Sequence, residues 1–316
     1  MDYKIYKLHF STAVHFGNGN LVDALNQLMA DTLFSAICVE AAKESKEAVE
    51  NVICLAKKGN LIISDAMPFI GDTLYIPKPA IHIETEKKGD SGVKKQFKKL
   101  KYIPLNKLSD YLNGVLNPTE ENSRIKNLGT AEIRTLAAVG VKKDAEEGAK
   151  EEAEPFFVGA YKFAEGNGLY VIAGFNTKEA ENIFEKYLAG VSYMGIGGKR
   201  SGGLGKFKFE KADFSNEKLT VKGGKENVYI TLSLSMAKEE ELGDVINEAS
   251  YVLVKRSGFI YSPNYANGDR RKKDFYAFQS GSCFKKSFAG DLFDVAGSGK
   301  HRVYRYAKPL FLEVKA

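Results

Sequence analysis

A glycine-rich segment, residues 195–205, carries residue types that suit phosphate binding. Six glycines surround a Lys-Arg-Ser triplet in this glycine loop. Glycine allows positive φ angles and close backbone approach, so successive N–H groups can turn toward one anion. Because Lys199 and Arg200 add two positive charges, we expect the loop to bind a phosphate chain. The residues assigned to this contact are Gly197, Gly198, Lys199, Arg200, Ser201 and Gly202.

The elements around the loop do not suit a nucleoside triphosphate or dinucleotide pocket. Phosphate loops of those two classes follow a strand and open a helix. Here the order is reversed, because residues 177–188 have helical spacing with Thr177 as the expected N-cap, and residues 204–210 alternate like a strand. Neither G-x-x-x-x-G-K-[ST] nor G-x-G-x-x-G fits the loop. The sequence favours a loop that clamps a phosphate backbone, and a flexible connection is the alternative.

A second group of basic and aromatic residues lies nearer the C-terminus. Arg256 follows an apolar strand and precedes a Ser-Gly pair, where a guanidinium can reach a phosphate or stack on a base. Phe259 and Tyr261 offer stacking faces, although aromatic side chains in a strand are often core. A basic turn from residue 270 either follows an RNA backbone or is solvated. The residues assigned to RNA contact here are Arg256, Ser257, Phe259, Tyr261, Arg270 and Arg271.

Acid–base chemistry has one candidate among the four histidines. His15 begins a glycine-containing turn at the end of a strand, but general acid–base catalysis needs a positioned partner, and no sequence-local one is visible. We expect His15 to brace the turn or to stack on a base. Asp31 is expected to cap a helix. Neither an adjacent Asp-Asp nor Gly-Gly-Asp-Asp occurs, so the signature of a two-metal polymerase is absent.

The composition narrows the class of protein. The chain has 316 residues, 44% of them hydrophobic, and a formal net charge of +6, which permits a nucleic-acid partner without requiring one. Its three cysteines are scattered, which argues against a disulfide framework or a zinc site and fits a reducing cytosol. The N-terminus lacks the apolar region of a signal peptide, and no run approaches a membrane span. We expect a cytoplasmic protein without metal or cofactor.

The first two thirds of the chain predict an α+β unit. Residues 3–12 alternate as a half-buried strand with Tyr6 and Leu8 on the core face, and a helix follows near Asp31. Short strands are expected at 61–64 and 73–76, and a hairpin is expected to join 156–163 to 169–175. With the helix and strand that flank the glycine loop, the order is strand, helix, strand, strand, helix, strand, which is typical of a ferredoxin-like fold.

This pattern sets the expected domain boundaries. Residues 1–212 form the first domain, with an insertion at about 77–154 that contains a lysine-rich run (86–101) and an acidic run. Aromatic and aliphatic residues interleave with the lysines, so a nucleic-acid surface and a solvated segment are equally good interpretations. The acidic run at 142–154 predicts a solvated or disordered segment. After a polar linker at 213–224, residues up to 316 predict a smaller, strand-rich domain.

Several motifs together resemble one known family. The sequence is similar to the RAMP-type proteins of CRISPR interference complexes, specifically subunit four of the type III-A Csm complex. The motifs occur in order along nearly the whole chain: His15-Phe-Gly, Asp31-Thr-Leu-Phe-Ser-Ala, Lys99-Leu-Lys-Tyr-Ile-Pro104, Phe156-Phe-Val with Gly168-Leu-Tyr-Val, the glycine loop, Lys255-Arg-Ser-Gly-Phe-Ile-Tyr-Ser262, Gly281-Ser-Cys-Phe284 and Val303-Tyr-Arg-Tyr-Ala-Lys-Pro-Leu-Phe-Leu312. One departure is that Glu132-Ile-Arg134 stands where relatives often carry an Ile-Asp-Arg-like triplet, so the family's role for that arginine is assigned to Arg134 only by this weak match.

The resemblance implies both a fold and a function. It implies two ferredoxin-like (RRM-like) domains and a glycine loop that touches RNA backbone. It implies a non-catalytic subunit that binds the 5′ repeat-derived tag of the crRNA, caps the backbone of the complex and anchors the large polymerase-like subunit beside an adjacent backbone RAMP subunit. A thumb-like hairpin, placed at about 77–127, would contact target RNA near the tag. The residues assigned to that duplex are Lys95, Lys98, Lys99, Lys101 and Tyr102.

Two other functions stay open at this point. Some RAMP relatives cleave RNA with a histidine, so an endoribonuclease that processes repeat RNA with His15 is the enzymatic alternative. A structural adaptor with little RNA contact is the third class, and the basic glycine loop weighs against it.

Overall fold

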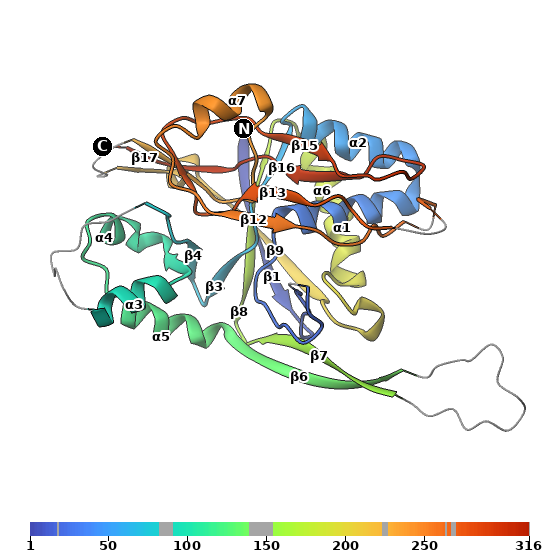
Figure 1. The fold of residues 1–316 in the computed structure, drawn as a ribbon, viewed down its shortest axis with the longest axis horizontal. Helices are drawn as coiled ribbons and strands as arrows, with labels where there is room; N and C mark the ends of the chain where they lie inside the picture. The colour runs from blue at the N-terminus through green and yellow to red at the C-terminus, as the bar shows by residue number, and fades with distance from the viewer. Residues whose placement is uncertain are drawn as a thin grey trace, which may run out of the picture.

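The computed structural model describes residues 1–17, 19–81, 91–138, 154–222, 227–262, 264–266 and 270–315 (Figure 1). The acidic run predicted to be disordered falls almost wholly outside these residues, as does the start of the lysine-rich run. Helices and mostly antiparallel sheets alternate along the chain, which agrees with the predicted α+β class.

The largest sheet is built from the first two thirds of the chain. Its strand order is β5-β4-β3-β8-β1-β9, and β2 also pairs with β8. In this order, β1 lies between β8 and β9, both antiparallel to it. The part β3-β8-β1-β9 agrees with the strand-helix-strand-strand-helix-strand pattern expected from the sequence. The strands are β1 (Asp2–Phe10), β2 (Leu61–Ile63), β3 (Met67–Ile70), β4 (Thr73–Pro77), β5 (Tyr102–Pro104), β8 (Asn167–Phe175) and β9 (Phe207–Asp213).

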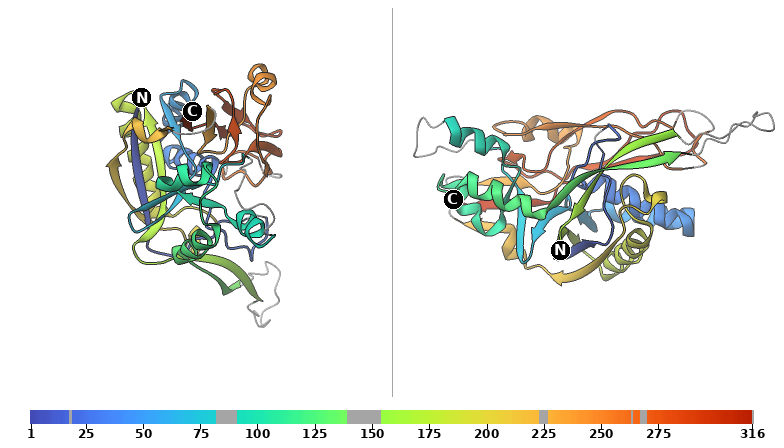
Figure 2. Two further views of the ribbon diagram at one scale, coloured as in Figure 1. Left: turned by 90° about the vertical axis from the view of Figure 1, so that its left-hand side faces the viewer. Right: turned by 90° about the horizontal axis from the view of Figure 1, so that it is seen from below.

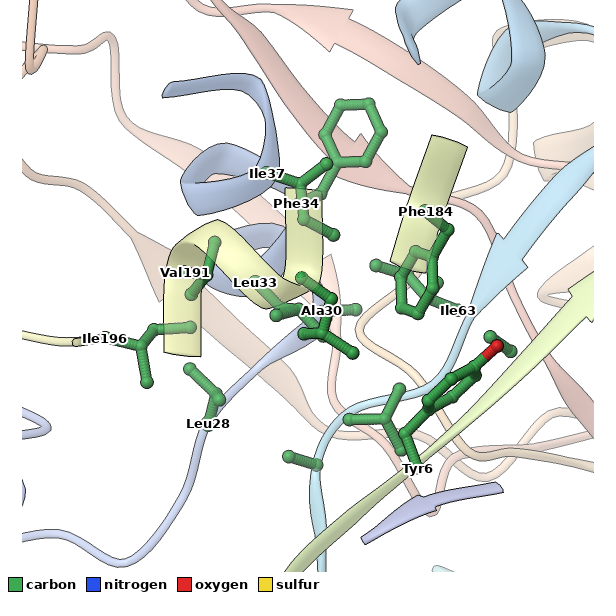
Figure 3. Packing of buried hydrophobic residues seen from close by; sticks show 14 of the residues in the cluster. Tyr6, Leu28, Ala30, Leu33, Phe34, Ile37, Ile63, Phe184, Val191 and Ile196 are labelled. Atoms are coloured by element: carbon green, nitrogen blue, oxygen red, sulfur yellow. The ribbon is translucent and has the colours of Figure 1, made fainter. Parts of the chain in front are cut away.

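Three helices pack on one face of this sheet. They are α1 (Ala30–Glu44), α2 (Lys46–Lys57) and α6 (Lys178–Met194). The predicted N-cap of α6 is confirmed, since the Thr177 hydroxyl accepts a hydrogen bond from the Ala180 N–H. Figure 3 shows Leu33 and Phe34 of α1 packed with Phe184 of α6 and with Tyr6. Among the described residues, no helix has the length and apolar character that a membrane span requires.

The opposite face of the sheet is also covered. A second sheet, with strand order β10-β17-β11-β14, contributes Ile230 and Leu312 to a core that also contains Ile5, Tyr170 and Ile172. Strand β1 is therefore buried on both faces around Ile5, where the prediction of a half-buried strand is wrong, whereas Lys7 and His9 on the same face as Ile5 are partly exposed. The strands of this second sheet are β10 (Thr220–Lys222), β11 (Val228–Thr231), β14 (Cys283–Phe284) and β17 (Phe311–Lys315).

The C-terminal third is less regular than the first sheet. The expected linker at 213–224 is wrong over most of its length, because it contains a 3₁₀ turn, η4 (Asn216–Leu219), and strand β10, which runs parallel to β17. Two small antiparallel pairs complete this part. Its remaining elements are α7 (Glu239–Val245), β12 (Leu253–Arg256), β13 (Phe275–Phe278), β15 (Asp291–Asp294) and β16 (Tyr304–Ala307).

The predicted insertion has two different parts. Between 77 and 127 the described residues form α3 (Ser91–Lys99), α4 (Leu108–Leu112), α5 (Pro118–Arg124), 3₁₀ turns and strand β5 of the main sheet, so the placement of a projecting hairpin there is wrong. A two-stranded hairpin of β6 (Gly129–Ala138) and β7 (Glu154–Phe163) instead projects from the body (Figure 1, Figure 2). Because β7 pairs with β6, the expected hairpin between residues 156–163 and 169–175 is also wrong among the described pairings.

Candidate nucleic-acid interface

The glycine loop connects the end of α6 to the start of β9, in the reversed order predicted from the sequence. The loop is closed at its base, where the Ile196 N–H donates to the Gly205 carbonyl at 2.9 Å. Gly205 has φ +82°, and a Cβ there would lie 2.1 Å from the Ile196 oxygen. Only glycine fits this crossing, so the loop is a fixed structure, which argues against the flexible-connection alternative.

The middle of the loop presents unused backbone donors. Lys199 has a left-handed conformation, with φ 57°, and a 3₁₀ turn over Arg200–Gly202 follows it. Within the described part of the chain, the backbone N–H groups of Lys199, Arg200 and Ser201 donate to no protein acceptor. Successive N–H groups in a turn after a left-handed residue form an anion-binding concavity.

Two aromatic rings hold the basic side chains of the loop. The Lys199 ammonium lies 4.7 Å from the centroid of the Phe156 ring in β7, and the Arg200 guanidinium lies 4.9 Å from that of Tyr261. Such cation–π contacts restrict a side chain without neutralising it. Neither cation forms an ion pair with a described carboxylate. The structure thus brings the loop, the β6–β7 hairpin and the Tyr261 segment together with net positive charge.

His15 lies beneath this loop and is nearly buried, at 7% exposure. Its Nδ1 lies 2.6 Å from the Gly159 carbonyl, and its own carbonyl accepts the Gly198 N–H at 2.9 Å. A Cβ on Gly198 would lie 2.5 Å from Cδ2 of the His15 ring. This geometry is that of a residue bracing the turn, and it gives the endoribonuclease alternative no accessible acid or base at this position.

Arg256 is engaged inside the molecule, contrary to its assignment to RNA. Its Nε and Nη2 donate to the two carboxylate oxygens of Asp31 at 3.0 Å each, and Arg305 donates to the same carboxylate. Burial works to raise the pKa of Asp31, but the two guanidinium groups outweigh it and hold the pKa below its usual value. A buried carboxylate needs such countercharge, and this demand explains why Arg256 turns inward.

The same cluster corrects the prediction for Asp31 and adds a residue. Met29, not Asp31, is the N-cap of α1, and the Asp31 side chain is only 1% exposed. Arg305 was not singled out from the sequence, although it lies in the motif that begins at Val303. Its side chain is 4% exposed and its Nη2 also donates to the Ser257 carbonyl. The available sequence signal was an arginine flanked by two tyrosines, Tyr304 and Tyr306, in a segment expected to be a strand.

The other C-terminal residues assigned to RNA are mostly exposed. Phe259 and Tyr261 are 76% and 73% exposed, so neither aromatic ring belongs to the core. Ser257 is also exposed, and Arg271 forms a backbone bridge with Phe259. Arg270 donates from its Nε to the Ala266 carbonyl at 3.1 Å. Both rings are thus accessible at the surface, and that of Tyr261 contacts the glycine loop through Arg200.

The lysines assigned to a duplex lie on α3 and just after it, away from the projecting hairpin. Lys95, Lys98, Lys99 and Lys101 are exposed. Tyr102 is only 9% exposed, and burial raises the pKa of its hydroxyl. Its assignment to duplex contact is therefore corrected, because little of the side chain is accessible at the surface.

A protein-family model and two proteins of known family that match this chain all bear the same name, Csm4. A model of the CRISPR Csm4 C-terminal domain matches residues 224–314. The CRISPR system protein Csm4 of Mycobacterium tuberculosis is 32% identical over 314 residues, which cover 99% of this chain and 98% of that protein. The Streptococcus thermophilus protein of the same name is 31% identical and covered in full, as is this chain.

Solved structures of similar fold cover almost the whole chain. A crystal structure of a Csm3–Csm4 subcomplex of the type III-A CRISPR-Cas interference complex contains a chain with a TM-score of 0.64 and 20% identity, and the match covers 99% of both chains. A Csm1–Csm4 cassette crystallised with cA4 contains one with a TM-score of 0.58 and 20% identity, covering 99% of this chain and 97% of that one. At this identity the match concerns the fold.

Proposed function

This chain belongs to the Csm4 family, and we propose from that premise that it is a non-catalytic subunit of a type III-A CRISPR interference complex. In this proposal it binds the 5′ repeat-derived tag of the crRNA and ends the protein backbone of the complex. It also anchors the large polymerase-like subunit on one side and the adjacent backbone RAMP subunit on the other. The similar structures pair a Csm4 chain with Csm3 or with Csm1, which supports these two partners.

The observation that carries the RNA-binding part is the centre of the glycine loop. Three consecutive backbone N–H groups, from Lys199 to Ser201, have no acceptor among the described residues, and they lie beside two cations that pair with no described carboxylate. Phosphates of a single strand would supply both the missing acceptors and the missing negative charge. The exposed rings of Phe259 and Tyr261 would stack unpaired bases nearby.

The β6–β7 hairpin is our candidate for the thumb that contacts target RNA near the tag. Ile133 and Phe157 lie on the same face of the hairpin and are 67% and 56% exposed. On the other face, Arg134 is held by Glu132 through a hydrogen bond of 2.6 Å from its Nε. Exposed apolar side chains on a narrow hairpin suit insertion beside bases. Contact of Lys95, Lys98, Lys99 and Lys101 with a duplex stays a separate prediction.

The division into two ferredoxin-like domains, 1–212 and 213–316, is also kept as a proposal. The strand order of the first sheet supports it for residues 1–212. For residues 213–316 the support is a second sheet of four strands, which is the strand number of a ferredoxin-like domain. Among the described residues of this part, α7 is its α-helix. A cytoplasmic location follows from the proposed complex.

The first test is purification of the tagged chain from cells that express a full type III-A operon and a CRISPR array. The expected result is a bound RNA population with uniform 5′ ends in the repeat tag, together with a stoichiometric large subunit. Heterogeneous RNA ends, or recovery without RNA and without the large subunit, would overturn the proposed function.

A paired variant tests the glycine loop directly. In Lys199→Ala/Arg200→Ala, the dependence of log K on log salt concentration for tag RNA should flatten by about 1.4, because two phosphate contacts to a single strand are lost. The matched control is Lys46→Ala/Lys58→Ala, which removes the same charge from exposed residues at the ends of α2. An unchanged slope in the loop variant would exclude the loop as a phosphate clamp.

A further inference from the structure

A second cationic feature lies away from the glycine loop. A pocket of about 420 Å³ lies between the β4–β5 region, the turn at 279–282 and the segment before α1. Its lining includes three lysines, Lys78, Lys98 and Lys101, and the polar residues Gln27, Gln279 and Ser282. This volume falls within the usual range for small-molecule sites. We call this feature the lysine pocket.

The three lysines place positive charge at the pocket, and the described residues supply no carboxylate that pairs with it. None of them forms an ion pair with a described carboxylate. Lys78 is held in place because its ammonium donates to the Phe97 carbonyl at 2.7 Å, and burial lowers its pKa. Asp65 accepts the N–H groups of Ala30 and Leu234 and, among the described residues, forms no ion pair with these lysines. An anion in the pocket would supply the missing countercharge.

The rest of the lining suits a nucleobase. The side chain of Val252 lies at the pocket and is 52% exposed, which offers an apolar surface at the rim. The two glutamine amides provide both donors and acceptors, and both Gln27 and Tyr102 line the pocket. The lining thus combines cations for a phosphate, an apolar face and adaptable polar groups.

The lysine pocket is linked to the glycine loop by one segment of the chain. Residues 11–29 contribute His15 beneath the loop and Gln27 at the pocket. The segment is fixed at several points by bridges from Val14 to Tyr161, Phe16 to Leu25 and Leu28 to Ala66. The same segment therefore contributes a residue to each of the two features.

We propose that the lysine pocket holds a single ribonucleotide turned out of the bound RNA strand, with its phosphate on the lysines and its base against Val252. This inference rests on the proposed function, because the strand is the RNA that the glycine loop grips. The same chemistry would suit a free nucleoside monophosphate, and the two sources are distinguished experimentally.

The test uses the full chain with Lys98→Ala/Lys101→Ala, two exposed lysines whose truncation leaves the Lys78 hydrogen bond intact. Fluorescence anisotropy with single-stranded tag RNA should give a Kd raised about ten-fold. The salt slope should be flatter by about 1.4, since two phosphate contacts are lost. Lys46→Ala/Lys58→Ala should change neither quantity. Val252→Asp, a second rim variant, should also weaken RNA binding through its negative charge.

Calorimetry with adenosine monophosphate and with inorganic phosphate separates the two sources. Adenosine monophosphate that competes with RNA for the wild-type chain, together with a flatter slope in the variant, would support the proposal. Loss of adenosine monophosphate binding with an unchanged RNA slope would overturn it in favour of a free nucleotide. Unchanged binding of both probes would overturn it altogether.

Cross-linking adds a readout of position. Tag RNAs that each carry one 4-thiouridine should cross-link to residues near 252 or 279–282 from one position only, and cross-links from many positions would contradict a single extruded nucleotide. Failure of the wild-type chain to bind any tag RNA would instead count against the proposed function, while the nucleotide arm would still test the pocket.

Discussion

Two buried aspartates close together experience opposite electrostatic environments. Asp31 is paired with Arg256 and Arg305, and these guanidinium groups hold its pKa below the usual value despite burial. Asp65 forms no ion pair with any cation in the part of the chain that the structure describes. Burial, as the largest cause, raises its pKa to about 6, although it accepts the N–H groups of Ala30 and Leu234. The two carboxylates therefore affect stability in opposite directions as the pH changes.

The first prediction concerns Asp65. Because its pKa is raised in the folded state, the unfolded chain loses the proton first as pH rises, and folding stability falls between about pH 4 and pH 6. Asp65→Asn keeps an acceptor oxygen for both N–H groups and removes this penalty. The free energy of unfolding of the variant, relative to the wild type, should increase by on the order of 3 kcal/mol from pH 4 to pH 7.5.

Urea unfolding at the two pH values measures this difference. Asp31→Asn is the contrasting variant, since the lowered pKa of Asp31 means that its contribution is present above its usual pKa and lost as pH falls below it. If the stability of Asp65→Asn relative to the wild type does not change with pH, the pKa of Asp65 is not raised in the folded protein.

For single residues, the sequence predicts the local element in which a side chain lies better than it predicts the side chain's interaction partner. Lys199 and Arg200 were predicted as the basic groups of a glycine loop between a helix and a strand, and the structure has them there. Arg256 looked equally available, but its partner Asp31 lies 225 positions earlier in the chain. A pairing over that distance depends on how helix α1 packs against the C-terminal strands β12 and β16, and local spacing carries no information about it.

At the scale of elements, the glycine loop shows which local signals suffice. Its reversed order, helix then strand, was predictable because Thr177 and the alternating phenylalanines of β9 are local features. The β6–β7 hairpin was placed elsewhere because its strands have weak alternation, with Ala131, Ile133 and Thr135 all exposed. Such strands are held by their backbone ladder rather than by a core.

The second prediction compares two glycines of the loop. In Gly205→Ala, the new Cβ would lie 2.1 Å from the Ile196 oxygen at a φ of +82°, so the base of the loop must open. The matched control is Gly202→Ala, where nothing lies within 4 Å of the added Cβ. We expect the melting temperature and tag-RNA affinity to fall for Gly205→Ala, with a loss of stability on the order of 1–3 kcal/mol.

Calorimetry and anisotropy on both variants provide the comparison. Gly202→Ala should melt like the wild type. Equal behaviour of the two substitutions, whether both are harmless or both harmful, would contradict the view that the loop depends on the close crossing at its base.

At the scale of the whole molecule, the two sheets share their cores. Ile5 and Tyr170 of the first sheet pack in one cluster with Ile230 and Leu312 of the second. Tyr306 of β16 joins the other cluster, beside Phe34 of α1. The Asp31 pairs and the hydrogen bond from Leu234 N–H to Asp65 add polar connections between the two parts. Neither proposed domain therefore completes its own core.

The last prediction follows from this shared burial. Because the apolar face of each sheet is covered by the other part of the chain, we expect 1–212 and 213–316 to unfold together in a single transition. Native-state hydrogen exchange should give the same opening free energy for amides of β1 and β8 as for those of β11 and β17. Substantially weaker protection of the second sheet would show instead that it opens as an independent domain. A fragment of 1–212 alone would expose Ile5, Tyr170 and Ile172, so its tendency to aggregate provides a second, independent readout of the same dependence.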